Sequence, residues 1–328
     1  MPTARPRLRP RHGLGLGSAA AAALLALLLA LVLAGCGGTA TATSHRVQVV
    51  AAFYPLQYAV QQVGGDHVDV TSLTKPGVEP HELELTPQDV AHVVDADLVV
   101  YEQHFQPAVD QAVEQEAPDH SLDVAPAAHL DLRISSGIGR ELPDEPFAGH
   151  ADEAGAIDPH FWLDPIRYAD VGHAIADRLA QLDPAHAADY RAGAARFSAR
   201  LHRLDHAFRS GLAHCRNDQL VTSHSAFGYL AHRYGLTQVG ITGLSPDVEP
   251  DPRTLADVAD YVRQHHVGTV YSETLASPAV ARAVASETGA HLAVLDPIEG
   301  LTDQSAGRTY FAIMRANLRT LQKGQGCS

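Results

Sequence analysis

The chain has 328 residues, of which 45% are apolar and 19% are charged, so it can bury hydrophobic cores and is not a disordered chain. Its formal net charge of −14 argues against a nucleic-acid binder, because no excess of basic residues is available to neutralise phosphates. Three Cys are too few for a disulfide scaffold or a four-thiolate metal site, whereas 20 His point toward metal chemistry, since His is the commonest metal ligand.

The N-terminal segment has the pattern of a secretory signal. Four Arg within residues 5–11 precede an apolar stretch over residues 19–34, which is short for a membrane-spanning helix but suits the apolar region of a signal peptide. The stretch runs into the sequence LAGC, which looks like a bacterial lipobox ending at Cys36. We therefore expect a lipoprotein signal peptide over 1–35, lipidation of Cys36 and a flexible tether over 36–46, with an uncleaved N-terminal anchor as the alternative. Either way the rest of the chain would be extracytoplasmic and attached to a membrane, at the cell surface or in the periplasm.

From residue 47 onward, short apolar runs typical of buried strands alternate with amphipathic helical segments. The expected strands cover residues 47–52, 68–73, 98–101, 122–124, 219–222, 238–242, 269–271 and 292–295. The expected helices cover residues 55–63, 87–96, 164–182, 184–211, 226–234, 253–265, 278–288 and 307–322. Residues 129–159 lack apolar periodicity and predict a long surface loop. This order predicts an N-terminal α/β domain over 47–183, a linking helix over 184–211 and a C-terminal α/β domain over 212–328.

Four polar side chains follow expected strands or lie in proline-bounded turns beyond a strand: His81, His160, His224 and Asp296. Ligands of open α/β sheets bind beyond the carboxyl ends of the strands, so these side chains are expected to point toward a common face. Three imidazoles and one carboxylate would form a closed four-coordinate shell that suits Zn²⁺. Taken singly, each of these His is better explained as a hydrogen-bonded or exposed side chain.

Other possible sites are weaker. His202 and His206 lie four residues apart on the long helix, but no third ligand is near them in the sequence, and we interpret them as part of a solvated face. The sequence contains no H-E-x-x-H, no G-x-S-x-G and no phosphate-binding glycine loop, so we expect no catalytic residues and no enzyme activity.

Several segments together resemble the zinc- and manganese-binding solute receptors of ABC importers: residues 52–56 (AFYPL), 64–68 (GGDHV), 76–87 (PGVEPHELELTP), 158–165 (DPHFWLDP), 222–229 (TSHSAFGY) and 295–297 (LDP). The resemblance covers nearly the whole chain after residue 46. It implies two Rossmann-like α/β domains joined by a single long rigid helix, with the metal in the cleft between them. It also implies that His81, His160, His224 and Asp296 are the ligands.

The resemblance implies an extracytoplasmic receptor that binds Zn²⁺ without catalysing a reaction. It would deliver the ion to an ABC importer permease driven by a cytoplasmic ATPase. We expect a monomer that binds no nucleic acid. Zinc is expected over manganese because imidazole suits Zn²⁺, whereas Mn²⁺ prefers carboxylates. The alternatives are a surface adhesin on the same scaffold, a manganese receptor and a metal-dependent hydrolase.

Zinc receptors of this family often carry a long His- and acid-rich stretch between the first two ligands. Here the corresponding loop holds only His129 and His150, with the acidic residues Asp144, Glu145, Asp152 and Glu153. A second metal site in the loop is therefore expected to be weak if it forms.

The remaining two thiols suggest a disulfide. If Cys36 carries the lipid, Cys215 and Cys327 are left in an oxidising compartment, where an even number of thiols favours a bridge. Such a bridge would hold the C-terminus against the segment that follows the linking helix.

Overall fold

The computed structural model describes Met1 and residues 46–136, 147–149 and 155–328. Arg46–Ser328 forms one compact unit. None of the helices in the described ranges combines the length and the apolar character that crossing a bilayer requires.

Three of the sequence predictions fall outside these ranges. They are the signal peptide over 1–35 with the tether up to His45, the lipidation of Cys36, and the weak loop site around His150.

The first sheet has four parallel strands in the order β2-β1-β3-β4. Their bounds are Val47–Ala51 for β1, Val68–Ser72 for β2, Leu98–Tyr101 for β3 and Ser121–Asp123 for β4. The central strands β1 and β3 are largely buried, as strands of a parallel sheet are when helices cover both faces. Its helices are α2 (Tyr54–Gly64), α3 (Pro87–Asp95), α4 (Pro107–Glu116) and α5 (Ala125–Ala128). The β-strands expected from the sequence are all present, but α4 and α5 were not predicted.

The second sheet has six parallel strands in the order β10-β9-β7-β8-β6-β5. Their bounds are Ser135–Ser136 for β5, Phe147–Gly149 for β6, Gln219–Thr222 for β7, Thr237–Gly240 for β8, Thr269–Ser272 for β9 and His291–Val294 for β10. The accompanying helices are α8 (Gly228–Tyr234), α9 (Pro252–Gln264), α10 (Ala279–Thr288) and α11 (Tyr310–Gly324). The two α/β domains predicted from the sequence are therefore both present.

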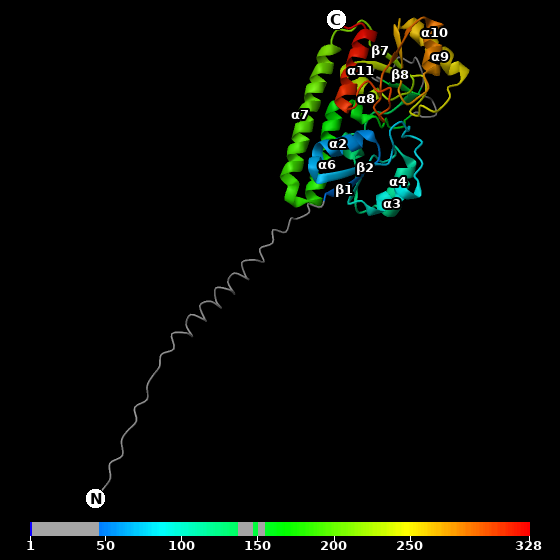
Figure 1. Ribbon diagram of the computed structural model, residues 1–328. Helices are drawn as coiled ribbons and strands as arrows, with labels where there is room; N and C mark the ends of the chain where they lie inside the picture. Colours follow the sequence, from blue (N-terminus) through cyan, green and yellow to red (C-terminus); the bar gives the residue numbers. More distant parts are fainter. Residues whose placement is uncertain (2–45, 137–146, 150–154) are drawn as a thin grey trace. The chain divides into compact units, whose positions relative to one another are not determined.

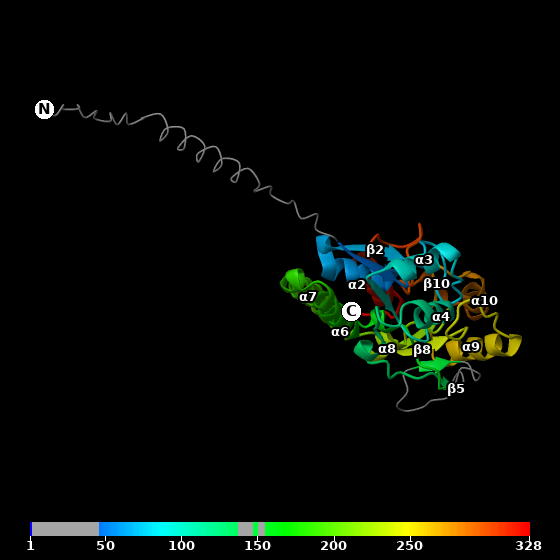
Figure 2. The same ribbon diagram turned by 90° about the horizontal axis from the view of Figure 1, so that it is seen from below.

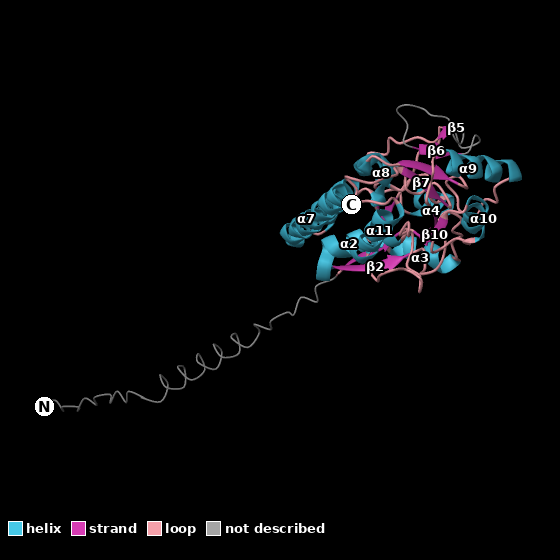
Figure 3. Ribbon diagram, turned by 90° about the horizontal axis from the view of Figure 1, so that it is seen from above, coloured by secondary structure: helices cyan, strands magenta, loops and turns pink. Residues whose placement is uncertain are grey.

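The expectation of an uninterrupted loop over 129–159 is wrong. Strands β5 and β6 lie within it, and β6 pairs with β8, with Phe147 opposite Gln238. Figures 2 and 3 show β5 at the rim of this unit. Strands of two and three residues are too short for an alternating pattern to be recognised in a sequence. Strands β5 and β6, which precede the long helix in the sequence, thus complete the second sheet. The second sheet therefore takes strands from both sides of residue 183.

The long helix α7 (Ala187–Gly211) packs against helices from both ends of the chain. It runs beside α6 (Pro165–Leu182) and also contacts α2 and α11 (Figure 1). Its buried residues lie along one face, as an amphipathic helix requires: Tyr190, Gly193, Ala194, Phe197, Leu201, Leu204 and Phe208. Gly193 is needed because a Cβ there would lie 2.2 Å from the carbonyl oxygen of Val63 in α2.

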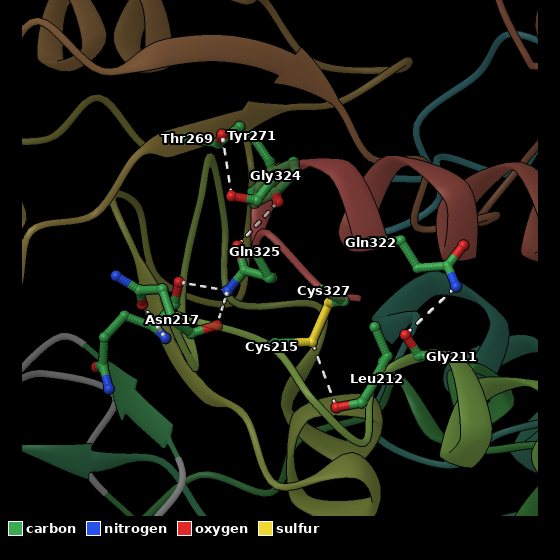
Figure 4. Close-up of a disulfide and its surroundings, with 11 residues drawn as sticks. Gly211, Leu212, Cys215, Asn217, Thr269, Tyr271, Gln322, Gly324, Gln325 and Cys327 are labelled. Atoms are coloured by element: carbon green, nitrogen blue, oxygen red, sulfur yellow. Dashed lines mark hydrogen bonds between the residues drawn. A yellow bond between two sulfur atoms is a disulfide. The ribbon is translucent and has the colours of Figure 1, made fainter.

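The predicted disulfide between Cys215 and Cys327 is present (Figure 4). It joins the segment after α7 to the segment after α11. The side chain of Gln325 is buried beside it and donates hydrogen bonds to the carbonyl oxygens of Asn217 and Gln219, at 3.2 and 2.9 Å. The C-terminus is therefore held to the start of β7 by one covalent bond and by buried hydrogen bonds.

Candidate metal centre

Three imidazoles and one carboxylate form a compact group between the loops of the two sheets. The candidate ligand atoms of His81, His160, His224 and Glu299 all lie within 4.8 Å of one another. His160, His224 and Glu299 are buried, and the side chain of His81 is 10% exposed. Within the described ranges, this is the one group of three or more His, Cys, Asp or Glu residues that could hold a metal ion.

His81 lies in the loop between β2 and α3, and a buried amide fixes this loop. Gln106 donates from its side-chain nitrogen to Thr74 Oγ1 and to the carbonyl oxygen of Pro80, both at 3.1 Å. Glu79 accepts a hydrogen bond from the backbone N–H of His81 at 3.0 Å. The imidazole is thereby positioned by a folded loop rather than by a strand.

His160 lies in a tight turn before the 3₁₀ helix Phe161–Leu163. Asp158 Oδ1 accepts from the backbone nitrogen of His160 at 2.9 Å and lies 2.7 Å from its Nδ1. All of these groups are buried, so the carboxylate fixes both the backbone turn and the orientation of the ring.

His224 follows β7, and its ring is held by a carboxylate from the neighbouring strand. Glu273, which follows β9, accepts from the backbone nitrogen of His224 at 3.0 Å and contacts Nδ1 through its second oxygen. Thr222 donates to the carbonyl oxygen of His224 at 2.6 Å, which further restrains the turn. Glu273 therefore does for His224 what Asp158 does for His160.

Glu299 is the centre of the group. Its Oε1 lies 3.1 Å from Nε2 of His160, 3.1 Å from Nε2 of His224 and 3.4 Å from Nε2 of His81. The Nδ1 atoms of His160 and His224 face carboxylates, so the ring hydrogen of each neutral imidazole is assigned to Nδ1. Nε2 then keeps the lone pair that a metal ion requires.

The structure differs from the sequence expectation at the fourth position, because Asp296 lies outside this group. Asp296 Oδ1 instead accepts from the backbone nitrogen of Ile298 at 2.8 Å, and Asn317 holds the backbone of Asp296 on both sides. Ile298 has a φ of 62°, a left-handed conformation that is costly for a β-branched residue. The chain turns sharply there, and it is the next residue, Glu299, whose carboxylate reaches the imidazoles.

The charges of the group are strongly coupled. Burial disfavours the ionised form of Glu299, but the three surrounding imidazoles hold the pKa of this carboxyl well below its usual range. Burial also opposes the charged forms of His160 and His224, yet their neighbouring carboxylates raise the pKa of both rings above the ordinary value. For His81, burial dominates and the pKa is lowered. Two imidazoles are thus poised to hold protons that a metal ion would displace.

Glu79 also lies at the edge of the group. Its Oε1 is 3.9 Å from Nε2 of His81. Burial raises the pKa of this carboxyl to about 7, although hydrogen bonds from the backbone of His81 and Glu82 oppose the shift. Its charge therefore changes near neutral pH, beside the most exposed of the three imidazoles.

The three His were predicted from the sequence, whereas the carboxylates around them were not. Asp158 lies two residues before His160, and Glu273 lies two residues after the expected strand 269–271, so both could have been singled out. Glu299 carries no such local signal. His202 and His206 are exposed on α7, as the sequence predicted.

Comparison with known proteins identifies the family. Residues 49–324 match the family described as zinc-uptake complex component A, periplasmic. The high-affinity zinc uptake system protein ZnuA of Bacillus subtilis is 36% identical over 280 residues, with 84% of this chain and 87% of that protein covered. The zinc-binding protein AdcA of Streptococcus pyogenes is 34% identical over 287 residues, with 84% of this chain and 56% of that protein covered. The chain thus spans about half the length of the AdcA relatives it matches.

Solved structures agree with this fold. The Zn(II)-bound ZnuA-like domain of AdcA from Streptococcus pneumoniae matches with a TM-score of 0.69 at 32% identity, covering 86% of this chain and 99% of that one. The laminin-binding protein Lmb of Streptococcus agalactiae, described as bifunctional with adhesin and metal-transporting activity, matches with a TM-score of 0.70 at 31% identity, covering 85% and 99%. The chain therefore belongs to the ZnuA family of periplasmic zinc-uptake components, a family of solute-binding proteins and not of enzymes.

Proposed function

We propose that this chain is an extracytoplasmic zinc receptor that binds Zn²⁺ through His81, His160, His224 and Glu299. The observation that carries the proposal is the convergence of three Nε2 atoms on one carboxylate oxygen at 3.1, 3.1 and 3.4 Å. A tetrahedral zinc ion with bonds of about 2.0–2.1 Å separates its ligand atoms by about 3.3–3.4 Å. The three distances from Glu299 Oε1 to the imidazole nitrogens are close to that value.

Chemistry also favours a cation at this point. Three lone pairs and a carboxylate oxygen repel one another unless protons or a metal ion lie between them. The donor set is rich in imidazole, which suits Zn²⁺ better than Mn²⁺. The carboxylates Asp158 and Glu273 orient two of the rings, as the outer partners of zinc-binding His commonly do.

The proposed role is capture and delivery rather than catalysis. Four protein ligands complete the tetrahedral shell of Zn²⁺ and leave no position for the activated water that a catalytic zinc uses. We propose that the loaded protein, as a monomer, passes the ion to an ABC importer permease with its cytoplasmic ATPase. The membership of the ZnuA family supports this partner class.

The test is a metal-content measurement followed by a chelator-competition titration of the purified protein that begins after Cys36. Wild type should hold one tightly bound Zn²⁺. Replacing His224 by Ala should weaken this binding by at least about tenfold, equivalent to about 1.4 kcal/mol. The matched control His202→Ala, an exposed His on α7, should leave it unchanged. Equal effects of the two substitutions, or no tight zinc in wild type, would contradict the proposal.

We propose further that lipidated Cys36 anchors the protein to the outer face of the membrane. The LAGC motif after an apolar stretch supports this, as does a relative named zinc-binding lipoprotein AdcA. Several acyl chains would anchor the protein stably, whereas one chain binds membranes only marginally. Mass spectrometry of the native N-terminus should find a lipid-modified Cys36, and cleavage elsewhere would contradict the assignment.

A second candidate function is adhesion, which the similarity to the bifunctional Lmb protein favours. It requires that the purified chain bind laminin-coated surfaces. Deletion of the gene would separate the two functions. If the protein is only an adhesin, the deletion strain should take up zinc normally; if it is a receptor, zinc uptake should fall.

A further inference from the structure

Trp162 connects the segment that carries His160 to the turn that carries Glu299. It is fully buried, two residues after His160, and its indole nitrogen donates to the buried carbonyl oxygen of Pro297 at 2.8 Å. Pro297 lies two residues before Glu299. The backbone carbonyl of Trp162 also accepts from the hydroxyl of Tyr310 on α11 at 2.6 Å. The segment before α6 is therefore hydrogen-bonded twice, through one residue, to the C-terminal part of the chain.

The ring of Trp162 belongs to an aromatic group behind the imidazoles. Its centroid lies 5.3 Å from that of His160, 5.0 Å from that of Phe53 and 5.7 Å from that of Phe105. Phe105 packs edge-on against His81, with a centroid distance of 4.7 Å. Because buried rings are close-packed, these contacts fix the orientation of the indole and the direction in which its N–H points.

The other end of the turn is tied to the loop of His81. The backbone N–H of Gly77 donates to the carbonyl oxygen of Leu301, two residues after Glu299, at 2.9 Å. Glu299 therefore lies between two hydrogen bonds that reach different imidazole segments, one at Pro297 and one at Leu301. The position of its carboxylate relative to the imidazoles depends on both bonds.

We propose that Trp162 is a positioning residue for zinc binding, whose indole N–H holds the turn so that the carboxylate of Glu299 reaches the imidazoles. The inference rests on the proposed zinc site and adds to it a residue that does not touch the ion. Without the N–H, the buried carbonyl of Pro297 would lose its partner, which is costly, and the turn would shift to find another. The three imidazoles would remain, and water would take the fourth position on the ion.

The experiment removes the N–H and keeps the ring. Trp162 is the single Trp of the chain, so biosynthetic incorporation of benzothienylalanine, in which sulfur replaces the indole N–H, changes this position alone. In a chelator-competition titration of the purified protein that begins after Cys36, the substituted protein should bind Zn²⁺ about fivefold more weakly than wild type, or by about 1 kcal/mol. Trp162→Phe, which removes the same donor, should weaken binding at least as much.

Tyr271→Phe is the matched control, because it also removes a buried hydrogen-bond donor from an aromatic side chain. The hydroxyl of Tyr271 donates to the side chain of Gln325 at 3.0 Å, beside the disulfide rather than at the metal centre. The substitution should leave the zinc affinity unchanged. An equal loss of affinity in Tyr271→Phe and Trp162→Phe would show a general loosening of the fold and overturn the proposal.

A double-mutant cycle tests whether Trp162 acts through Glu299. In the Glu299→Gln background, adding Trp162→Phe should weaken zinc binding by less than about twofold, because the carboxylate that Trp162 positions is already absent. With Co²⁺ in place of Zn²⁺, Trp162→Phe and Glu299→Gln should shift the visible absorption in the same direction, since both lose the same ligand. Losses of affinity that add fully, or an unchanged Co²⁺ spectrum in Trp162→Phe, would show that the ring serves only packing.

The wild-type titration separates this inference from the receptor function. A wild type without tightly bound zinc would overturn both. A wild type that binds zinc tightly, together with a benzothienylalanine protein of equal affinity, would overturn the positioning role of Trp162 and leave the receptor function intact.

Discussion

Asp158 Oδ1 lies 2.7 Å from Nδ1 of His160 and 2.9 Å from the backbone nitrogen of the same residue. One buried carboxylate thus sets both the turn that carries His160 and the ring hydrogen that frees Nε2 for a metal ion. Residues in this outer position commonly change metal affinity by about 10- to 100-fold when replaced.

We therefore expect Asp158→Asn to weaken zinc binding by at least about tenfold, because a neutral amide supports the basic Nε2 of His160 less than a carboxylate does. A chelator-competition titration measures this. Asp177→Asn on the exposed face of α6 is the matched control and should leave the affinity unchanged. An unaltered affinity in Asp158→Asn would show that the carboxylate serves only the local turn.

The fourth ligand can be tested by comparing two acidic residues of the same loop. Glu299→Gln should weaken zinc binding by at least about tenfold, or about 1.4 kcal/mol, because it removes the charged oxygen on which the three imidazoles converge. Asp296→Asn should weaken it less, since the amide oxygen can still accept from the backbone nitrogen of Ile298. A larger loss of zinc affinity in Asp296→Asn than in Glu299→Gln would show that Asp296 is the fourth ligand, as the sequence predicted.

Zinc binding should weaken as the pH falls. The pKa values of His160 and His224 are raised above the ordinary value, so protons compete with the metal already at pH values above about 6.5. The depressed pKa of Glu299 keeps this carboxylate ionised over the same range. Calorimetry in buffers of different ionisation enthalpy should detect proton release on binding near neutral pH. Affinity that stays constant between about pH 8 and pH 6 would contradict these pKa directions.

The metal-free protein should show the opposite trend in stability. An imidazole whose pKa is raised by folding stabilises the native state below its unfolded pKa, and this contribution is lost as the pH rises through the folded value. In denaturant titrations of the metal-free chain, the contribution of His160 and His224 to the free energy of unfolding should therefore decrease above about pH 6.5. In the variant His160→Ala, the free energy of unfolding should depend less on pH in this range.

The disulfide should stabilise the fold without altering the zinc site. Cys215 and Cys327 are separated by 112 positions, for which the chain-entropy model gives a stabilisation of about 4–5 kcal/mol. The double variant Cys215→Ser/Cys327→Ser should lose much of this free energy of unfolding. Its zinc affinity should stay unchanged, because Cys215 precedes β7, whereas His224 follows it at the opposite end.

Thiol titration of the unfolded chain provides the accompanying measurement. Without reductant, Cys215 and Cys327 should contribute no free thiols. Two reactive thiols from these positions would show that the bridge does not form.

Most of the regular elements could be predicted from the sequence because their signals are local, although α4 and α5 were missed. Buried strands such as β3 are continuous apolar runs, and α7 repeats apolar residues every three or four positions. The positions after expected strands and in proline-bounded turns singled out His81, His160 and His224, but also Asp296, which lies outside the group. Strands β5 and β6 escaped prediction because they are too short for a pattern and pair with a distant part of the chain.

Only the tertiary structure decided which carboxylate joins the three imidazoles. Asp296 and Glu299 are equally acidic in the sequence, and the choice depends on the left-handed turn at Ile298. Distant residues hold the start of this turn: Trp162 donates from its indole nitrogen to the carbonyl oxygen of Pro297 at 2.8 Å. The sequence by itself determined the alternation of strands and helices and the metal-binding character, because these follow from residue type and spacing. The arrangement of the site follows in large part from hydrogen bonds between distant segments, such as Glu273 with His224 and Trp162 with Pro297, which no local pattern records.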